Sequence, residues 1–154
     1  MVSLLLYATQ TYPDIQFSAN PITQFSGNPG IPHLEAAKCI LCYLKSTQNF
    51  SLVLGYHGRE AINVVGWTNS DWAGDVDTRQ LVEGFVFDVA GGCVSWSLKK
   101  QVSVATSLVE AEYVALANTT KEAVWLQTLL KEVSYPQAQA TIVHADNQGT
   151  MALA

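Results

Sequence analysis

The sequence predicts an α/β fold in which a mixed β-sheet is flanked by helices and follows a smaller helical segment. The first observation is a hairpin signal, because two aromatic and β-branched runs, 83–90 and 93–98, are joined by Gly91-Gly92. A further β-rich run begins at Ala61 and completes an antiparallel meander. A long helical pattern and a last short β run follow the meander. This order indicates a sheet that mixes strand directions.

The long helix has a clear beginning and end. Ser107 and Glu110 have the spacing of a capping box, with Ser107 as the N-cap and Glu110 reaching back to it. An apolar stripe then continues to about Val133, with a break near residues 118–120 as an alternative. Tyr135-Pro136 stops the helix.

The last β run, residues 141–145, determines the topology. The preceding helix is too long for a hairpin connection, so this strand should run parallel to one of the first three. A right-handed crossover that returns it beside the strand from Ala61 is favoured. Asn69 and Asp146 would then end neighbouring strands, at the sheet edge where ligand sites lie.

The N-terminal residues are expected to form a separate, smaller unit. Prolines break the segment before residue 30, and a short helix is predicted between the breaks. Pro32 suits the first turn of a second helix that runs to about Thr47. Residues 49–57 have the composition of a strand. The predicted units are therefore residues 1–57 and residues 61–154.

The composition is that of a folded chain with an acidic balance. Of its 154 residues, 49% are hydrophobic and 14% are charged. Eight Lys and Arg against thirteen Asp and Glu give a net charge of −5. This balance counts against strong autonomous binding of nucleic acid, although a local basic patch is compatible with it. No apolar run is long enough to span a bilayer, and the N-terminus does not have the pattern of a signal peptide.

The three cysteines are Cys39, Cys42 and Cys93. An odd number without a secretory signal indicates reduced thiols, no disulfides and an intracellular compartment. Cys39 and Cys42 form a CxxC within an amphipathic helix pattern, and no second ligand pair follows. We therefore expect them to pack as small apolar groups and not to bind zinc.

Three positions converge in the predicted topology: Asn69 and Asp146 at two strand ends, and Glu112 near the start of the long helix. Carboxylates in such an arrangement suit hard divalent cations. Two Mg²⁺ ions ~4 Å apart can activate a water and stabilise the leaving oxygen of a phosphodiester.

Four ordered motifs resemble the RNase H domain of copia-type retrotransposon polyproteins: GWTNSDWAGDVDTR, GFVFDVAGGCVSWSLKKQ, EAEYVALANTTKEAVWLQTLL and HADNQGTMALA. Upstream, YPDIQFSANPITQF and HLEAAKCILCYLKST resemble the end of the reverse transcriptase that precedes this domain. The resemblance covers essentially the whole chain. It implies a reverse transcriptase remnant over residues 1–57 and an RNase H-like fold over residues 61–154.

The resemblance also implies an activity, the Mg²⁺-dependent cleavage of RNA in RNA–DNA hybrids, with Mn²⁺ as an alternative ion. Glu112 matches the glutamate of the family's helix and Asp146 matches its second aspartate, both of them metal ligands. The implied partners are the hybrid and the rest of the reverse transcriptase polyprotein. The implied location is the cytoplasm or the nucleus.

Position 69 departs from the family's pattern, G-Y-x-D-A-D-W-A, which has its first metal-bridging aspartate there. Asn69 offers one neutral carbonyl oxygen in place of two anionic oxygens, so we expect the metal-dependent rate to fall by orders of magnitude. Asp71 lies on the same strand face and is a candidate substitute ligand. An offset of ~6–7 Å along the strand favours its interpretation as a solvated carboxylate at a loop entrance.

Two further departures concern the end of the chain and one loop. The family's last strand, last helix and final acidic ligand lie beyond Asp146, and the chain stops at Ala154. We therefore expect a fold truncated after its fourth strand, with an open edge and marginal stability. RQLVEG at residues 79–84 replaces the family's usual basic residue followed by Ser and Thr.

Candidate nucleic-acid contacts follow the third strand. Lys99 and Lys100 are predicted phosphate contacts, with Trp72 and Trp96 as stacking surfaces. The alternative is that Trp96 belongs to the core and that the lysines solvate a strand end. His144 shares a strand face with Asp146 and is interpreted as a surface or packing residue.

Two hypotheses for function remain. The first is a metal-dependent nuclease domain that is degenerate at its first ligand and inactive in this chain. The second is a non-catalytic retroelement remnant with at most weak nucleic-acid binding. The residue at position 69 distinguishes an active nuclease, which would have aspartate there, from an inactive one.

Overall fold

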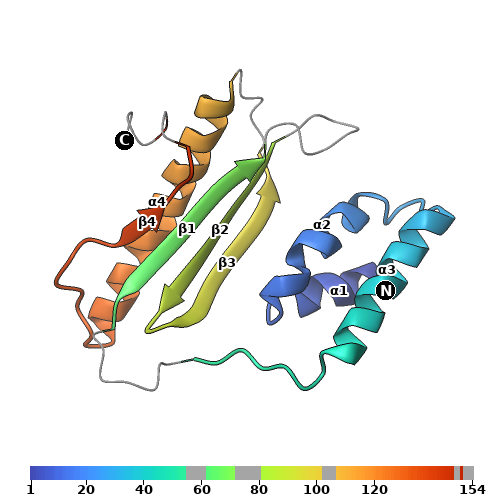
Figure 1. The fold of residues 1–154 in the computed structure, drawn as a ribbon, viewed down its shortest axis with the longest axis horizontal. Coiled ribbons are helices and arrows are strands. Elements are labelled where there is room, and N and C mark those ends of the chain that lie inside the picture. Colours follow the sequence, from blue (N-terminus) through green and yellow to red (C-terminus); the bar gives the residue numbers. More distant parts are fainter. Residues whose placement is uncertain (55–61, 72–80, 102–106, 148–149, 151–154) are drawn as a thin grey trace. The chain divides into compact units, whose positions relative to one another are not determined.

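The computed structural model describes residues 1–54, 62–71, 81–101, 107–147 and 150. The chain divides into two compact units, residues 1–52 and residues 53–154. Figure 1 shows the helices of the first unit and the sheet of the second. None of the helices in the described part of the chain is both long and apolar enough to span a membrane.

The first unit is a small helical assembly with a core of its own. Its elements are α1 (Val2–Ala8), the 3-10 turn η1 (Pro13–Ile15), α2 (Gln16–Gln24) and α3 (Ile31–Ser46). Their buried side chains form one apolar cluster: Leu5, Ile15, Ala19, Ile22, Ala37 and Ile40. The helix between the proline breaks and the helix opened by Pro32 are confirmed, and α1 is additional to the predicted elements.

Two predictions for this region are wrong. Residues 49–54 form no strand, and the rest of the predicted strand lies outside the described residues. Phe50 is 74% exposed and Leu54 64% exposed, so the apolar run has no neighbouring strand to pair with and no surface to bury. Cys39 and Cys42 are free thiols on α3, but both are exposed and do not pack as core residues.

The second unit contains the predicted mixed sheet. Its strands are β1 (Val64–Asp71), β2 (Val82–Val89), β3 (Gly92–Lys100) and β4 (Ile142–His144), in the order β3-β2-β1-β4. The first three pair antiparallel, and β4 runs parallel to β1 with His144 opposite Trp67. The predicted α/β class, the meander and the position of the fourth strand are therefore confirmed.

The predicted hairpin between β2 and β3 is present, but its turn lies one residue earlier than expected, at Ala90-Gly91, and Gly92 begins β3. Ala90 and Gly91 adopt φ values of 51° and 75°, and two consecutive residues with positive φ match the right-handed twist of the flanking strands. Glycine accepts this conformation at no steric cost, whereas Ala90 accepts it because the following turn and ladder hold it in place.

The crossover helix α4 (Leu108–Glu132) begins at the predicted cap, where Ser107 Oγ accepts a hydrogen bond from the Glu110 backbone N–H at 3.2 Å. The alternative of a break near residues 118–120 is wrong. Thr119 and Thr120 donate their hydroxyls to carbonyls one turn earlier, both at 2.8 Å. Their polar groups are thereby satisfied within an unbroken helix.

The sheet has two different faces. α4 covers the face that carries Val64 and Phe87, which pack against Ala123 and Leu126 of the helix (Figure 1). Thr68 and Thr119 share a hydrogen bond across this interface, with their Oγ1 atoms 2.8 Å apart. The opposite face carries a row of directly paired residues: His144, Trp67, Val86 and Trp96. In this row Trp67 is 43% exposed and stacks on His144, with ring centroids 5.6 Å apart.

Candidate active site at the carboxyl end of β1

Glu112 is the most unusual carboxylate in the sheet domain. It lies one residue beyond the first turn of α4 and is only 4% exposed. Burial raises the pKa of its carboxyl group, and the negative charge of Asp146 raises it further. The backbone N–H and the hydroxyl of Ser70 act in the opposite direction and lower this pKa. Glu112 therefore faces the end of β1, and its carboxyl group is close enough to Asp146 for the two charges to interact.

Ser70 is a site residue that the sequence analysis did not identify. Strand alternation places Thr68 and Ser70 on the face covered by α4, and Ser70 is 5% exposed. The signal for this assignment was weak because Val64 and Val65 are both apolar, so either face of β1 could have been the buried one. Ser70, and not Asn69, is the β1 residue that faces Glu112.

Three buried side-chain polar atoms among the described residues have no partner in hydrogen-bond geometry: Ser70 Oγ, Gln101 Oε1 and Glu112 Oε2. The Ser70 hydroxyl thus influences the Glu112 carboxyl through its proximity and not through a well-formed hydrogen bond. An unsatisfied buried polar atom costs free energy unless a water, an ion or a ligand atom completes it. The three atoms come from the end of β1, the residue after β3 and the beginning of α4, which marks this end of the domain as a place for a polar ligand.

Asp146 and Asn69 lie at the open end of the same two strands. Asp146 is exposed and follows β4 by two residues. The register pairs Trp67 with His144, so Asn69 and Asp146 are each two residues beyond the last paired position. Asn69 is exposed on the face opposite α4 and pairs with Gly84 of β2. No contact between Asn69 and Glu112 is found among the described residues.

The other predicted site residues are placed differently. Asp71 is the last residue of β1 and pairs with Val82, but its side chain and all of Trp72 lie outside the described residues. Lys99 has a side chain that is 56% exposed, and its Nζ lies 3.4 Å from Glu83 Oε1. Lys100 pairs with Val82 and so belongs to the opposite face of the sheet.

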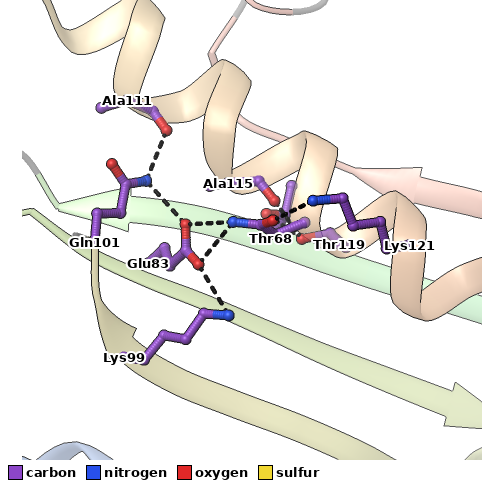
Figure 2. A network of polar contacts seen from close by, with 9 residues as sticks. Thr68, Glu83, Lys99, Gln101, Ala111, Ala115, Thr119 and Lys121 are labelled. Atoms are coloured by element: carbon purple, nitrogen blue, oxygen red, sulfur yellow. Dashed lines mark hydrogen bonds and ion pairs between the residues drawn. The ribbon is translucent and has the colours of Figure 1, made fainter. Parts of the chain in front are cut away.

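A buried network surrounds Glu83 of β2 (Figure 2). Glu83 is 5% exposed, and Asn118 Nδ2 donates to both of its carboxylate oxygens at 3.0 and 3.1 Å. Gln101 Nε2 donates to Glu83 Oε2 at 2.9 Å and to the Ala111 carbonyl at 3.1 Å. The network joins β2, β3 and α4 close to Glu112.

The donor set fits one divalent cation better than two. Glu112 supplies a buried carboxylate with an unpartnered oxygen, and Asp146 supplies a second carboxylate close enough to affect its pKa. Within the described ranges there is no cluster of three or more Asp, Glu, His or Cys side chains. Hard cations prefer several oxygen ligands, so Ser70, which faces Glu112, would have to contribute a neutral oxygen.

This combination of a mixed sheet, a crossover helix and carboxylates at the strand ends defines the class as an α/β domain with a polar site at its sheet edge. The chain is 40% identical over 153 residues to the retrovirus-related Pol polyprotein from transposon TNT 1-94 of Nicotiana tabacum, covering 99% of this chain and 11% of the relative. It is 35% identical over 149 residues to the Pol polyprotein from transposon RE1 of Arabidopsis thaliana, covering 97% of this chain and 10% of the relative.

A shorter relative matches along most of its own length. The secreted RxLR effector protein 161 of Plasmopara viticola is 44% identical over 116 residues, which are 75% of this chain and 80% of that protein. The chain belongs to the same family as this protein, and it is 32–40% identical over nearly its whole length to retrovirus-related Pol polyproteins from transposons. It spans about a tenth of the Pol polyproteins that it matches. No model of a known protein family matches the chain, and no solved structure matches it.

Proposed function

We propose that residues 61–154 are an RNase H-like domain whose cleavage of RNA in RNA–DNA hybrids has been lost, and that residues 1–57 are the end of a reverse transcriptase. The relationship to retrotransposon Pol polyproteins supports a transposon-derived fragment. The observation that carries the nuclease assignment is the buried Glu112 carboxylate, with an unpartnered oxygen and with Asp146 nearby. Burial of a carboxylate without a partner costs free energy of folding, and sites where such a group is kept are often functional.

Glu112 and Asp146 would hold the divalent cation, Mg²⁺ in the first place and Mn²⁺ as an alternative. A bound cation of this kind would polarise a phosphodiester oxygen and lower the pKa of a coordinated water. The protein's own contribution is orientation: Ser70 faces the Glu112 carboxylate from β1, and α4 excludes water from one side of it. Asp146, which is exposed, is the ligand accessible to a substrate.

Loss of activity follows from position 69. A pair of cations places about four positive charges in the site, and Glu112 with Asp146 offsets only two of them. Asn69 adds a neutral amide oxygen where an aspartate would add a negative charge. Glu112 and Asp146 would hold one cation, whereas a second would lack anionic ligands among the described residues. We expect hydrolysis close to the uncatalysed background.

The test is cleavage of a labelled RNA–DNA hybrid in Mg²⁺ or Mn²⁺ by the unmodified chain, by Asn69→Asp and by Asn69→Asp combined with Glu112→Gln. We expect background cleavage by the unmodified chain, a gain of about tenfold or more from Asn69→Asp, and loss of that gain in the double variant. Asn63→Asp is the matched control, since Asn63 is exposed just before β1 and its substitution makes the same charge change.

Robust cleavage by the unmodified chain that depends on Glu112 would overturn the proposed inactivity. A gain from Asn63→Asp equal to that from Asn69→Asp would attribute the effect to net charge and overturn the role of position 69.

The second hypothesis, a remnant that only binds nucleic acid weakly, is favoured by one observation. The Lys99 ammonium lies beside the buried Glu83 carboxylate, which offsets its charge.

A further inference from the structure

We propose that Gln101 is a positioning residue for Glu112, acting through the Glu83 network to fix the start of α4 against β2 and β3. The role of Glu112 is that of the proposed function, and the experiment below separates the two. Gln101 follows β3 and is 4% exposed. Its backbone N–H donates to the carbonyl of Leu81, the residue before β2, at 2.8 Å. This bond fixes the backbone of Gln101 beside the start of β2 independently of its side chain.

The side-chain amide of Gln101 connects the sheet to the helix. Its Nε2 donates to Glu83 Oε2 at 2.9 Å and to the Ala111 carbonyl at 3.1 Å, and both bonds are buried (Figure 2). Ala111 is the residue before Glu112 and is fully buried against Leu81. One amide group therefore determines where the backbone immediately before Glu112 lies relative to β2.

Glu83 makes this anchor rigid. Both of its oxygens accept hydrogen bonds from Asn118 Nδ2, and Lys99 approaches Oε1 from β3. Asn118 is in α4, so the carboxylate is held by the helix as well as by the strands. A carboxylate that three side chains contact cannot rotate freely, and it keeps the Gln101 amide turned toward Ala111.

The geometry of an α-helix explains why the position of Ala111 affects the direction of the Glu112 side chain. Successive residues are turned by about 100° around the helix axis, so a shift of the first turn by one residue would move Glu112 away from Ser70. Two further hydrogen bonds support this turn: the Ser107 cap, which is exposed and competes with water, and a long bond of 3.4 Å from Thr150 Oγ1 to the Val109 carbonyl. The buried Gln101 bond to Ala111 is the contact that sets the orientation of the Glu112 carboxylate.

The experiment compares Gln101→Ala with Gln127→Ala by NMR on the full chain. Gln127 donates its Nε2 to Thr141 Oγ1 at 2.8 Å near the other end of α4, so the control removes a bond of the same type from the same helix. Amide hydrogen exchange is measured along α4, and Mn²⁺ titration measures paramagnetic broadening of the Glu112 resonances. Thermal unfolding gives the global loss of stability for both variants.

We expect Gln101→Ala to accelerate exchange of the amides of residues 112–115 about tenfold beyond the global change, and to weaken the Mn²⁺ effect at Glu112. Gln127→Ala should leave both readouts at their original values once global stability is taken into account. A second variant exchanges the pair, Glu83→Gln with Gln101→Glu. It restores a donor–acceptor pair between β2 and β3, but the carboxylate that it places at position 101 cannot donate to the Ala111 carbonyl.

The exchanged pair should therefore leave the amides of residues 112–115 unprotected beyond any change in global stability. Equal exchange changes in Gln101→Ala and Gln127→Ala, or full protection in the exchanged pair, would overturn the positioning role. Absence of any Mn²⁺ effect at Glu112 in the unmodified chain would instead overturn the proposed function, and the exchange data would still decide the role of Gln101.

Discussion

Among the residues of the proposed site, Glu112 has the most unfavourable environment for a charge. Its carboxylate is buried, and Oε2 has no hydrogen-bond partner among the described residues. Such a group destabilises the fold in its charged form, which is why structural positions rarely contain it. Active sites retain groups of this kind because their reactivity depends on the same burial.

Glu112→Gln is predicted to stabilise the chain at pH 8 by about 0.5–2 kcal/mol, and the gain should vanish near pH 4. Burial raises the pKa of Glu112 in the folded chain. The carboxyl is then harder to ionise in the folded than in the unfolded state, so stability is lost as pH rises through the folded pKa. Below the ordinary pKa of a glutamate both states are protonated, and a neutral glutamine makes little difference.

Thermal or urea unfolding at the two pH values measures this effect. Glu122→Gln is the control, because Glu122 is also in α4 and accepts a hydrogen bond from Ser95 Oγ at 2.6 Å. A lower stability of Glu112→Gln at pH 8, or an equal gain at both pH values, would contradict the assignment of a burial penalty to this carboxylate.

Glu112 and Asp146 could be proposed from the sequence because each lies in a motif of adjacent residues. Ser70 and Gln101 could not. The contact of Ser70 depends on which face of β1 is buried, and two consecutive valines leave that face undetermined. The role of Gln101 depends on Glu83 and Asn118, which are 35 residues apart in the chain and meet only after the sheet and helix have packed.

At the scale of elements, the close approach of β1 and β2 requires a glycine at position 66. A Cβ built on Gly66 would lie 2.4 Å from Phe87 Cε1. Phe87 has no exposed surface and packs with Val64 and Leu126, so its ring has no space into which to move. The backbone of β1 can therefore pass over this ring only where the side chain is absent.

Gly66→Ala is predicted to destabilise the domain by about 1–3 kcal/mol. Gly84→Ala is the matched control, since its Cβ would lie 3.0 Å from Leu98 Cδ1, the end of a flexible side chain that can shift. Unfolding in urea measures both, and Phe87→Leu combined with Gly66→Ala should recover part of the loss. Equal costs for the two glycine variants would refute a specific conflict with Phe87.

Elements whose signals are local were predicted well. The β2–β3 hairpin follows from its glycines, and the beginning of α4 follows from Ser107 and Glu110. The strand expected at residues 49–57 failed because a strand exists only through its neighbours, and no neighbour pairs with residues 49–54. The position of β4 was predictable because a parallel strand needs a long crossover and α4 supplies one.

For the whole molecule, charge restricts what the chain can bind. The net charge is −5, and one of its eight basic side chains, Lys99, lies beside a buried carboxylate. Binding of nucleic acid that does not depend on sequence comes almost entirely from cations that replace counterions on phosphates. The acidic balance of the chain therefore counts against strong autonomous binding of a hybrid.

We predict a Kd weaker than about 10⁻⁴ M for a labelled RNA–DNA hybrid at physiological salt, as measured by fluorescence anisotropy. Lys99→Ala should change this affinity by less than a factor of about two, because its charge is offset by Glu83. Micromolar binding with a steep dependence on salt would contradict this prediction, because it would show a basic surface that the net charge conceals.

The stacked pair of Trp67 and His144 has a practical consequence. β4 contains only Ile142–His144, and its last rung on β1 joins these two rings. An indole emits differently when an imidazole lies against it than when water replaces that ring. Trp67, which is partly exposed, is thus an intrinsic optical reporter of β4 docking, and its emission beside that of His144→Ala would reveal how often the shortest strand of the sheet detaches.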